Sequence, residues 1–181
     1  MDPEPRTVPT PPEVPPPVIS VRLLRQDDLR GLEWSADNVR YRRLFLSAFN
    51  DMQAGTRVLF VATAAQDVVG RVFIQLDSTD TRYADGVQRA YLYALRVRPE
   101  WQRHGIGSRL VAAAEAELRA RGFRWAAIAV GKENPGALRL YQRLGYAIFS
   151  EDPGIWYYTD DQGNLRREHE PSWIMQKALA V

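Results

Sequence analysis

Hydrophobic and polar positions alternate along the first half of the chain in the pattern of β-strands. Residues 18–25 alternate in this way and are rich in branched side chains, which predicts a first strand. Residues 57–64 and 68–76 are two further β-rich runs, and the short polar turn between them predicts an antiparallel hairpin. Between the first strand and this hairpin, Asp27 and Asn38 are predicted to cap two helices.

The second half alternates apolar runs with amphipathic segments. Residues 90–97 and 123–130 are apolar enough to be buried strands, and residues 108–121 place their apolar side chains on one face of a helix. Asn134 is predicted to cap a shorter helix that ends near Gly145. The remaining predicted elements are a strand over 146–150, a hairpin over 155–170 and a last strand over 173–179.

The order of these elements predicts a single mixed sheet. Two strands joined by a helix, as over residues 90–130, run parallel and are linked by a right-handed crossover, whereas the first half is antiparallel. The chain is therefore predicted to be an α/β (α+β) protein. Its central sheet is expected to be mixed but mostly antiparallel, with helices on both faces, in one domain over residues 18–181.

The first seventeen residues have a different composition. They hold 8 of the 12 prolines, and such a run can neither form a sheet ladder nor bury a core. We expect a disordered proline-rich tail over residues 1–17. It lacks the basic start and apolar stretch of a signal peptide, and no other window approaches the length of a membrane span.

Composition excludes several kinds of chemistry. The chain of 181 residues has no cysteine and two histidines, which rules out disulfides, cysteine nucleophiles and multi-histidine metal sites, so no metal is expected. The net charge of +2 comes from 24 basic and 22 acidic side chains spread along the chain, which does not indicate a nucleic-acid partner. Without cysteine, an export signal or a membrane span, we expect a cytoplasmic protein with no membrane partner.

The loop before the helix at 108–121 carries the candidate chemistry. Gly105 and Gly107 let the backbone approach a ligand, and the N–H groups that open the helix suit a phosphate or pyrophosphate. A glycine-rich turn that only starts a helix is the alternative interpretation. A Walker loop is excluded because Ser108 stands where it needs lysine, and a dinucleotide-binding fingerprint is excluded because Leu110 replaces its third glycine.

Residues 102–107, Gln-Arg-His-Gly-Ile-Gly, resemble the Gln/Arg-x-x-Gly-x-Gly/Ala signature of the GNAT superfamily of acetyl-CoA-dependent N-acetyltransferases. The lead-in at 95–99 is similar to the Leu-x-Val-x-Pro of that family. Residues 134–146 are similar to its asparagine followed by a helix ending in Leu-Tyr-x-x-x-Gly-Phe/Tyr. The resemblance is strong over 90–150 and weaker over 18–89, and it implies a sheet splayed between its fourth and fifth strands.

This resemblance implies that acetyl-CoA is bound as the acyl-donor substrate. Backbone N–H groups over residues 103–108 would hold its pyrophosphate, and Leu95 and Val97 would offer backbone groups to its pantetheine arm as a neighbouring strand would. Asn134 would contact the cofactor or fix the splay, or act only as a helix cap. The implied cofactor-binding residues are Leu95, Val97, Gln102, Arg103, His104, Gly105, Ile106, Gly107, Ser108 and Asn134.

Tyr141 matches the general acid of the family, which protonates the departing CoA thiolate; its spacing along the helix also fits a packing role. The glutamate that many members carry on the fourth strand is absent here. The base would then be water held by backbone groups or a carboxylate from elsewhere, and Glu33 is the candidate. Its alternative role is solvent-exposed helix surface. Loop carboxylates are weaker candidates: Asp77, Asp80 and Asp85.

The predicted function is transfer of the acetyl group of acetyl-CoA directly to a primary amine of a small molecule or peptide. An alternative is a CoA-binding sensor or interaction module without turnover, and a longer acyl chain also stays open. Trp156, Tyr157, Tyr158 and Trp173 would form either a wall of the acceptor site or the core of the late hairpin, with core favoured. Pairing of the late strands between subunits would give a homodimer.

Overall fold

Seven strands form the central sheet of the computed structural model, which describes residues 18–180; the predicted tail over 1–17 lies outside the described residues. The strand order is β1-β2-β3-β4-β5-β9-β6, and β4 and β5 form its one parallel pair. The strands are β1 (Ile19–Leu23), β2 (Arg57–Ala64), β3 (Asp67–Gln75), β4 (Arg89–Val97), β5 (Trp125–Gly131), β6 (Ala147–Asp152) and β9 (Ser172–Ala178). The predicted mixed, mostly antiparallel sheet and the hairpin of its second and third strands are confirmed.

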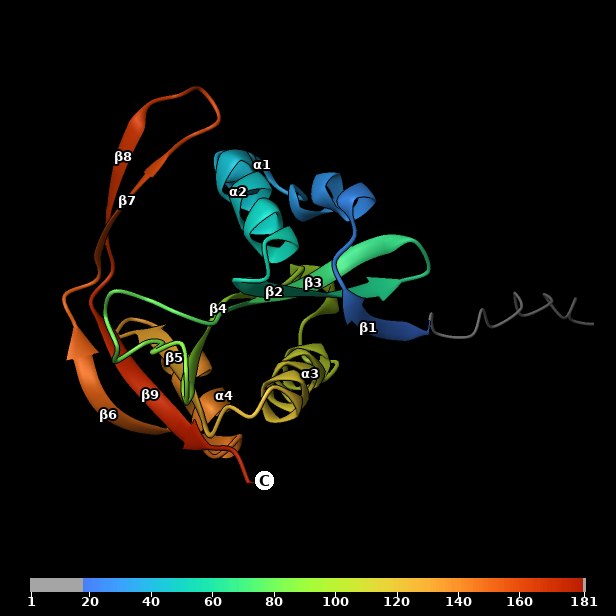
Figure 1. Ribbon diagram of the computed structural model, residues 1–181. Coiled ribbons are helices and arrows are strands. Elements are labelled where there is room, and N and C mark those ends of the chain that lie inside the picture. Colours follow the sequence, from blue (N-terminus) through green and yellow to red (C-terminus); the bar gives the residue numbers. More distant parts are fainter. Residues whose placement is uncertain (1–17, 181) are drawn as a thin grey trace, which may run out of the picture.

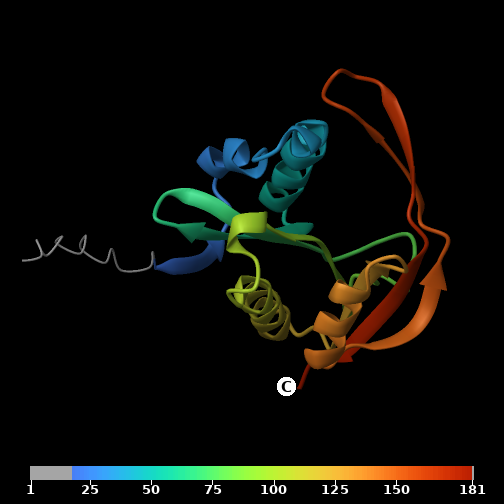
Figure 2. The same cartoon turned by 180° about the vertical axis from the view of Figure 1, so that it is seen from behind.

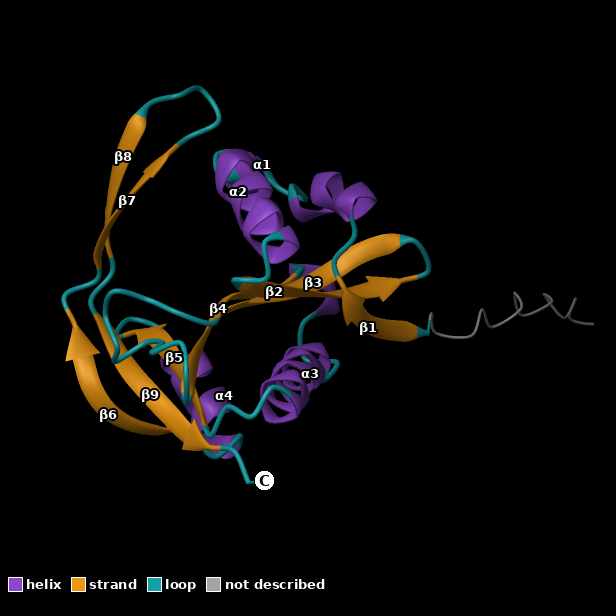
Figure 3. Cartoon of the chain, viewed as in Figure 1, coloured by secondary structure: helices purple, strands orange, loops and turns teal. Residues whose placement is uncertain are grey.

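Helices cover both faces of the sheet, as predicted (Figures 1 and 3). One face carries the 3-10 helix η1 (Gln26–Leu32) and the helices α1 (Ala36–Val39) and α2 (Arg42–Gln53). The other face carries α3 (Ile106–Ala120) and α4 (Pro135–Arg143), which are seen together from behind in Figure 2. The 3-10 turn η2 (Pro99–Trp101) links β4 to the loop before α3.

Both predicted caps in the first helical region are wrong. Asp28, not Asp27, accepts the Arg25 backbone N–H at 2.7 Å, because the guanidinium of Arg22 on β1 binds the Asp28 carboxylate at 2.7 and 2.9 Å. Asn38 lies buried inside α1, where Ser35 occupies the N-cap position. In both cases a hydrogen bond to an arginine of the sheet, rather than local spacing, positions the side chain: Arg22 binds Asp28 and Arg71 binds Asn38.

The helix predicted from Ser108 begins two residues earlier, at Ile106. Gly105 adopts φ +73°, a left-handed conformation that glycine tolerates without strain, and it turns the chain into the helix. Ile106 is 1% exposed, so burial of its side chain fixes the first turn against the sheet.

The predicted late hairpin forms a separate two-stranded sheet, β7 (Ile155–Thr159) with β8 (Leu165–His169). It projects from the end of the main sheet and curves toward α1 and α2 (Figure 1). Tyr41 holds it there, with ring centroids 6.3 Å from Trp156 and 5.1 Å from Tyr158. The hairpin therefore forms one side of the space beneath these helices.

The base of the hairpin depends on Gly154. Its φ is +69°, and a Cβ at this position would collide with the Glu170 backbone carbonyl, which leads into β9. We expect Gly154→Ala to lower the free energy of unfolding by clearly more than the roughly 1–2 kcal/mol of a left-handed alanine. Gly163 has a φ of +88°, and an added Cβ would lie no closer than 3.6 Å to the atoms around it. Gly163→Ala therefore measures the cost of a left-handed alanine without a collision. Equal losses in the two variants, measured by urea unfolding, would contradict the predicted collision.

Candidate active site

The parallel strands β4 and β5 separate halfway along their length. They pair from Arg89 with Trp125 to Leu92 with Ile128, and the pairing stops there although both strands continue. A bulge on β4 accompanies the separation, and Ala94 within it has φ +53°. The splay between the fourth and fifth strands, which the resemblance implied, is confirmed, and it leaves backbone groups of β4 facing an opening.

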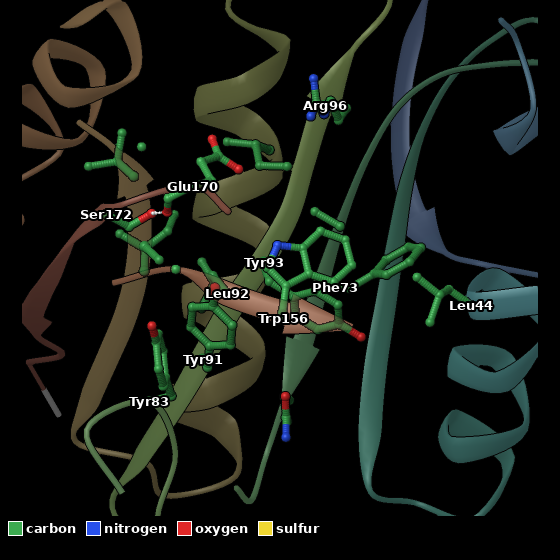
Figure 4. A pocket seen from close by; sticks show the side chains of 18 of the residues that line it. Leu44, Phe73, Tyr83, Tyr91, Leu92, Tyr93, Arg96, Trp156, Glu170 and Ser172 are labelled. Carbon is green, nitrogen blue, oxygen red and sulfur yellow. Dashed lines mark hydrogen bonds between the residues drawn. The ribbon is translucent and has the colours of Figure 1, made fainter. Parts of the chain in front are cut away.

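A cavity of about 680 Å³ occupies this opening and the space beneath α2. Its walls come from α2, α4, the start of β7 and every strand of the main sheet except β1. Figure 4 shows Arg96 at one end of the labelled side chains, Tyr83 and Tyr91 at the other, and Trp156 between them. A space of this size suits a small substrate or the end of a larger one.

The loop before α3 presents unbonded donors at a helix start. Arg103 and Gly105 both have left-handed backbones, with φ of +64° and +73°. The first helical hydrogen bond runs from the Arg109 N–H to the Gly105 carbonyl at 3.1 Å, so the N–H groups of residues 106–108 have no helical carbonyl to bond. At Gly107 the nearest atom to an added Cβ is 3.9 Å away on Leu140, so the backbone is open to an approaching anion.

Gln102 and His104 shape this loop from within. The Gln102 amide donates to the Val97 carbonyl at 3.1 Å, and the His104 ring nitrogen Nδ1 lies 2.8 Å from the Gln102 carbonyl. Gln102 therefore ties the end of β4 to the start of the loop. Of the two β4 residues expected to face a pantetheine arm, Leu95 lines the cavity, whereas Val97 is not part of its wall.

Two predicted residues from α4 line the cavity, Asn134 and Tyr141. Asn134 is confirmed as the helix cap, since its side chain accepts the Ala137 N–H at 3.0 Å. Tyr141 is 6% exposed, and burial raises the pKa of its phenol to about 12, while the nearby charge of Arg96 opposes that rise. The Tyr141 phenol is therefore protonated at neutral pH.

Glu33 does not line the cavity. Its carboxylate accepts two hydrogen bonds from Arg42, at 2.6 and 2.8 Å, and its side chain is 14% exposed. The loop aspartates named as weaker candidates do not line it either. None of the sequence-based candidates for the base therefore lies in the cavity wall, and the role given to them stays a prediction.

Two other carboxylates line the cavity, Asp152 and Glu170. Asp152 is engaged: it accepts from Arg82 at 3.0 Å and from the Gly154 N–H at 2.6 Å. The Glu170 carboxylate forms no ion pair within the described residues and is exposed. A Cβ added at Gly131, where β5 ends, would lie 3.3 Å from its carboxyl carbon, so Glu170 sits over the splay.

The late aromatic residues lie in the cavity wall, in the interior and at the surface. Trp156 lines the cavity, whereas Tyr158 is 4% exposed and packs on Tyr41, and Tyr157 points to solvent. The sequence analysis missed the aromatic lining from β4, Tyr91 and Tyr93. Their alternating positions on one strand were the available signal, since residues two apart share a face.

The comparisons with known proteins agree with this geometry. A family model described as "Acetyltransferase (GNAT) family" matches residues 25–146. A mycothiol acetyltransferase from Nocardiopsis dassonvillei is 38% identical over 68 residues, which is 38% of this chain and 21% of that protein. A second, from Thermobifida fusca, is 35% identical over the same shares. The chain thus spans about a fifth of the length of these curated relatives.

Solved structures share the fold at low sequence identity. The ribosomal-protein-S18-alanine N-acetyltransferase from Escherichia coli has a TM-score of 0.66 at 21% identity, covering 91% of this chain and 96% of its own. Arabidopsis thaliana NAA60 in complex with acetyl-CoA has a TM-score of 0.69 at 20% identity, covering 90% and 99%. At this identity the likeness shows the fold alone.

Residues 18–180 contain neither a membrane-crossing helix nor a cluster of metal ligands. No helix in that range combines the length and apolar composition that a membrane crossing needs. In the same range, no three metal-ligating side chains gather where they would hold a metal ion.

Proposed function

The chain belongs to the acetyltransferase (GNAT) family, and from this premise we propose that it transfers the acetyl group of acetyl-CoA to a primary amine. The observation that carries the proposal is the splay of β4 and β5, which opens a cavity with the Tyr141 phenol in its wall. The donor would lie along the exposed edge of β4, and the acceptor would enter beneath α2.

The chain offers a fitting site for each part of the donor. The N–H groups of residues 106–108 and the positive end of the α3 dipole suit a pyrophosphate. Beyond Leu92 the edge of β4 that faces β5 is unpaired, and it suits the amide groups of pantetheine, which would add to this edge as a strand does. When bound, acetyl-CoA supplies a thioester carbonyl for the amine to attack and a thiol leaving group.

Tyr141 acts as the general acid in this proposal. Its phenol lines the cavity and has a pKa near 12, so it carries the proton that the departing thiolate needs. The charge of Arg96 favours the phenolate that forms when this proton leaves. The chain has no cysteine, which excludes an acyl group carried on a cysteine of the enzyme, and in this proposal the amine attacks the thioester directly.

Glu170 takes the proton of the acceptor amine in this proposal, directly or through one water. It is the carboxylate in the cavity wall that is free of an ion pair within the described residues. A carboxylate at the cavity also weakens the case for a CoA-binding module without turnover, which rested on the missing strand glutamate.

We expect Glu170→Gln to lower kcat/KM for the amine by roughly 10- to 100-fold, because the amine must then lose its proton to solvent. This loss lies at or below the lower end of the range for general base catalysis. The loss should shrink as the pH rises and the fraction of free amine grows. Glu133→Gln removes an exposed carboxylate outside the cavity and is the matched control. An unchanged pH–rate profile in Glu170→Gln would remove Glu170 from the mechanism.

The proposed function is tested by thiol release from acetyl-CoA across a panel of amines and peptides. A thiol reagent reports only CoA here, since the protein contributes no cysteine. We expect release that depends on one class of amine and saturates with it. Binding of acetyl-CoA without release for any amine in the panel would favour the non-catalytic module.

A further inference from the structure

Arg71 on β3 is a buried charge without a carboxylate partner. The residue is 3% exposed and lines the cavity. Its Nη1 and Nη2 atoms make two long hydrogen bonds, 3.3 Å each, to the Leu32 carbonyl and the Asn38 side chain. Its Nε has no partner among the described residues. The guanidinium also packs 4.7 Å from the ring centroids of Trp34 and of Phe45.

A second arginine stands directly across from it. Arg71 and Arg96 are register partners in the β3–β4 pair, and both line the cavity. Like charges in this arrangement repel each other, and burial together with the Arg96 charge lowers the pKa of Arg71 to about 9. Among the described residues neither forms a salt bridge, unlike Arg57, which lines the same cavity and is paired with Asp51 at 2.9 Å.

The Arg71 charge is costly in the free protein, because a buried charge needs a partner to offset its lost hydration, and the charge of Arg96 across from it adds to that cost. The rings of Trp34 and Phe45 pack against the Arg71 guanidinium and hold it in place but do not neutralise its charge. A planar anion in the cavity would satisfy the fork of donors that an arginine presents. We infer that Arg71 and Arg96 together bind a carboxylate group of a substrate of this site.

The position of the pair points to the acceptor as the substrate that carries this carboxylate. Arg71 lies one strand away from the β4–β5 splay, and its neighbours Leu32, Asn38 and Phe45 belong to the first three helices. These helices cover the face opposite α3, whose N-terminus is the candidate pyrophosphate site. The inference rests on the proposed function and narrows its acceptor to an amine that also carries an acid. The second source of a carboxylate for this pair is an acyl donor whose acyl group carries one.

The test measures binding, so it does not require turnover. The probes are the N-acetyl derivatives of the twenty amino acids, each paired with its carboxamide and titrated calorimetrically into the full chain saturated with CoA. We expect at least one free acid to bind about tenfold or more tightly than its amide. Arg96→Gln and Arg71→Gln should each remove that difference. Arg124→Gln, an exposed arginine in the loop before β5, should keep it.

A parallel arm compares succinyl-CoA with acetyl-CoA. A tenfold preference for succinyl-CoA that both arginine variants abolish would assign the carboxylate to the acyl donor. Equal affinity of acids and amides, together with equal affinity of the two CoA esters, would overturn the inference. An acid or succinyl-CoA preference that Arg96→Gln leaves unaltered would also overturn the inference. Because Arg96 is exposed, this variant avoids any folding defect that the Arg71 variant has.

The two proposals fail separately. Acid-selective binding that depends on both arginines, but without thiol release for any amine, would end the proposed function and keep the carboxylate site. Thiol release at equal rates for acids and amides, together with equal affinity for succinyl-CoA and acetyl-CoA, would keep the acetyltransferase and end the carboxylate site.

Discussion

Gly107→Val should reduce acetyl-CoA affinity by at least about 100-fold while the domain still folds. The position lies in the first turn of α3, where an added Cβ meets no atom closer than 3.9 Å, so the protein itself has room for a side chain. The same space is where a pyrophosphate must approach the N–H groups of residues 106–108. A branched side chain there would hold the anion away from these donors.

Gly107→Ala separates stability from binding in the same position. Alanine replaces glycine favourably within a helix, by about 0.5–1 kcal/mol, so this variant should unfold at the same or a slightly higher temperature. Its acetyl-CoA affinity should nevertheless fall, though less than in Gly107→Val. Calorimetric titration and thermal unfolding measure the two effects. Wild-type affinity in a folded Gly107→Val protein would show that the anion binds elsewhere.

Tyr141→Phe should lower kcat while leaving acetyl-CoA affinity unchanged. The substitution keeps the ring and its edge-to-face contact with Tyr146, at 6.1 Å between centroids, and removes only the phenolic proton. General acid steps are worth roughly 10²–10⁴ in rate. We expect the lower end, since a thiolate is a fair leaving group and water can substitute. The measurement is kcat under conditions in which chemistry limits the rate.

Tyr146→Phe is the matched control for this prediction. Tyr146 is equally buried, but its hydroxyl donates to Glu115 at 3.1 Å and it lies outside the cavity wall. Removing that hydroxyl should cost roughly 1 kcal/mol of stability and leave kcat unchanged. Equal kcat values for Tyr141→Phe and the wild type would leave Tyr141 with a packing role only.

Local spacing was sufficient to predict the parts of the site that short segments build. The glycine-rich loop and the cap of α4 by Asn134 follow from residues close together in the chain. The resemblance to the family motif, rather than the helical spacing, pointed to Tyr141, which lines the cavity. The motif also predicted the splay, although only the register of β4 with β5 shows where the strands part, after Leu92.

The missed features depend on contacts between distant segments. Glu170 reaches the cavity because its backbone N–H bonds to the Gly154 carbonyl at 2.8 Å, at the base of a hairpin whose path the sequence does not define. Arg71 reads in the sequence as one polar residue within an apolar strand. Its lack of a partner becomes visible only when β4 places Arg96 across from it. A contact also places Glu33, since Arg42 of α2 binds its carboxylate and the residue lies outside the cavity wall.

The most direct test of direct acetyl transfer follows the acetyl group itself. Acetyl-CoA labelled in its acetyl carbon is incubated with the protein and with any amine that supports thiol release, and the label is traced by mass spectrometry. We expect label on the amine nitrogen in the same amount as the thiol released, with none on the protein. In Gly107→Val this transfer should fall to background. Label retained on the protein, or thiol released without a labelled amine, would contradict direct transfer.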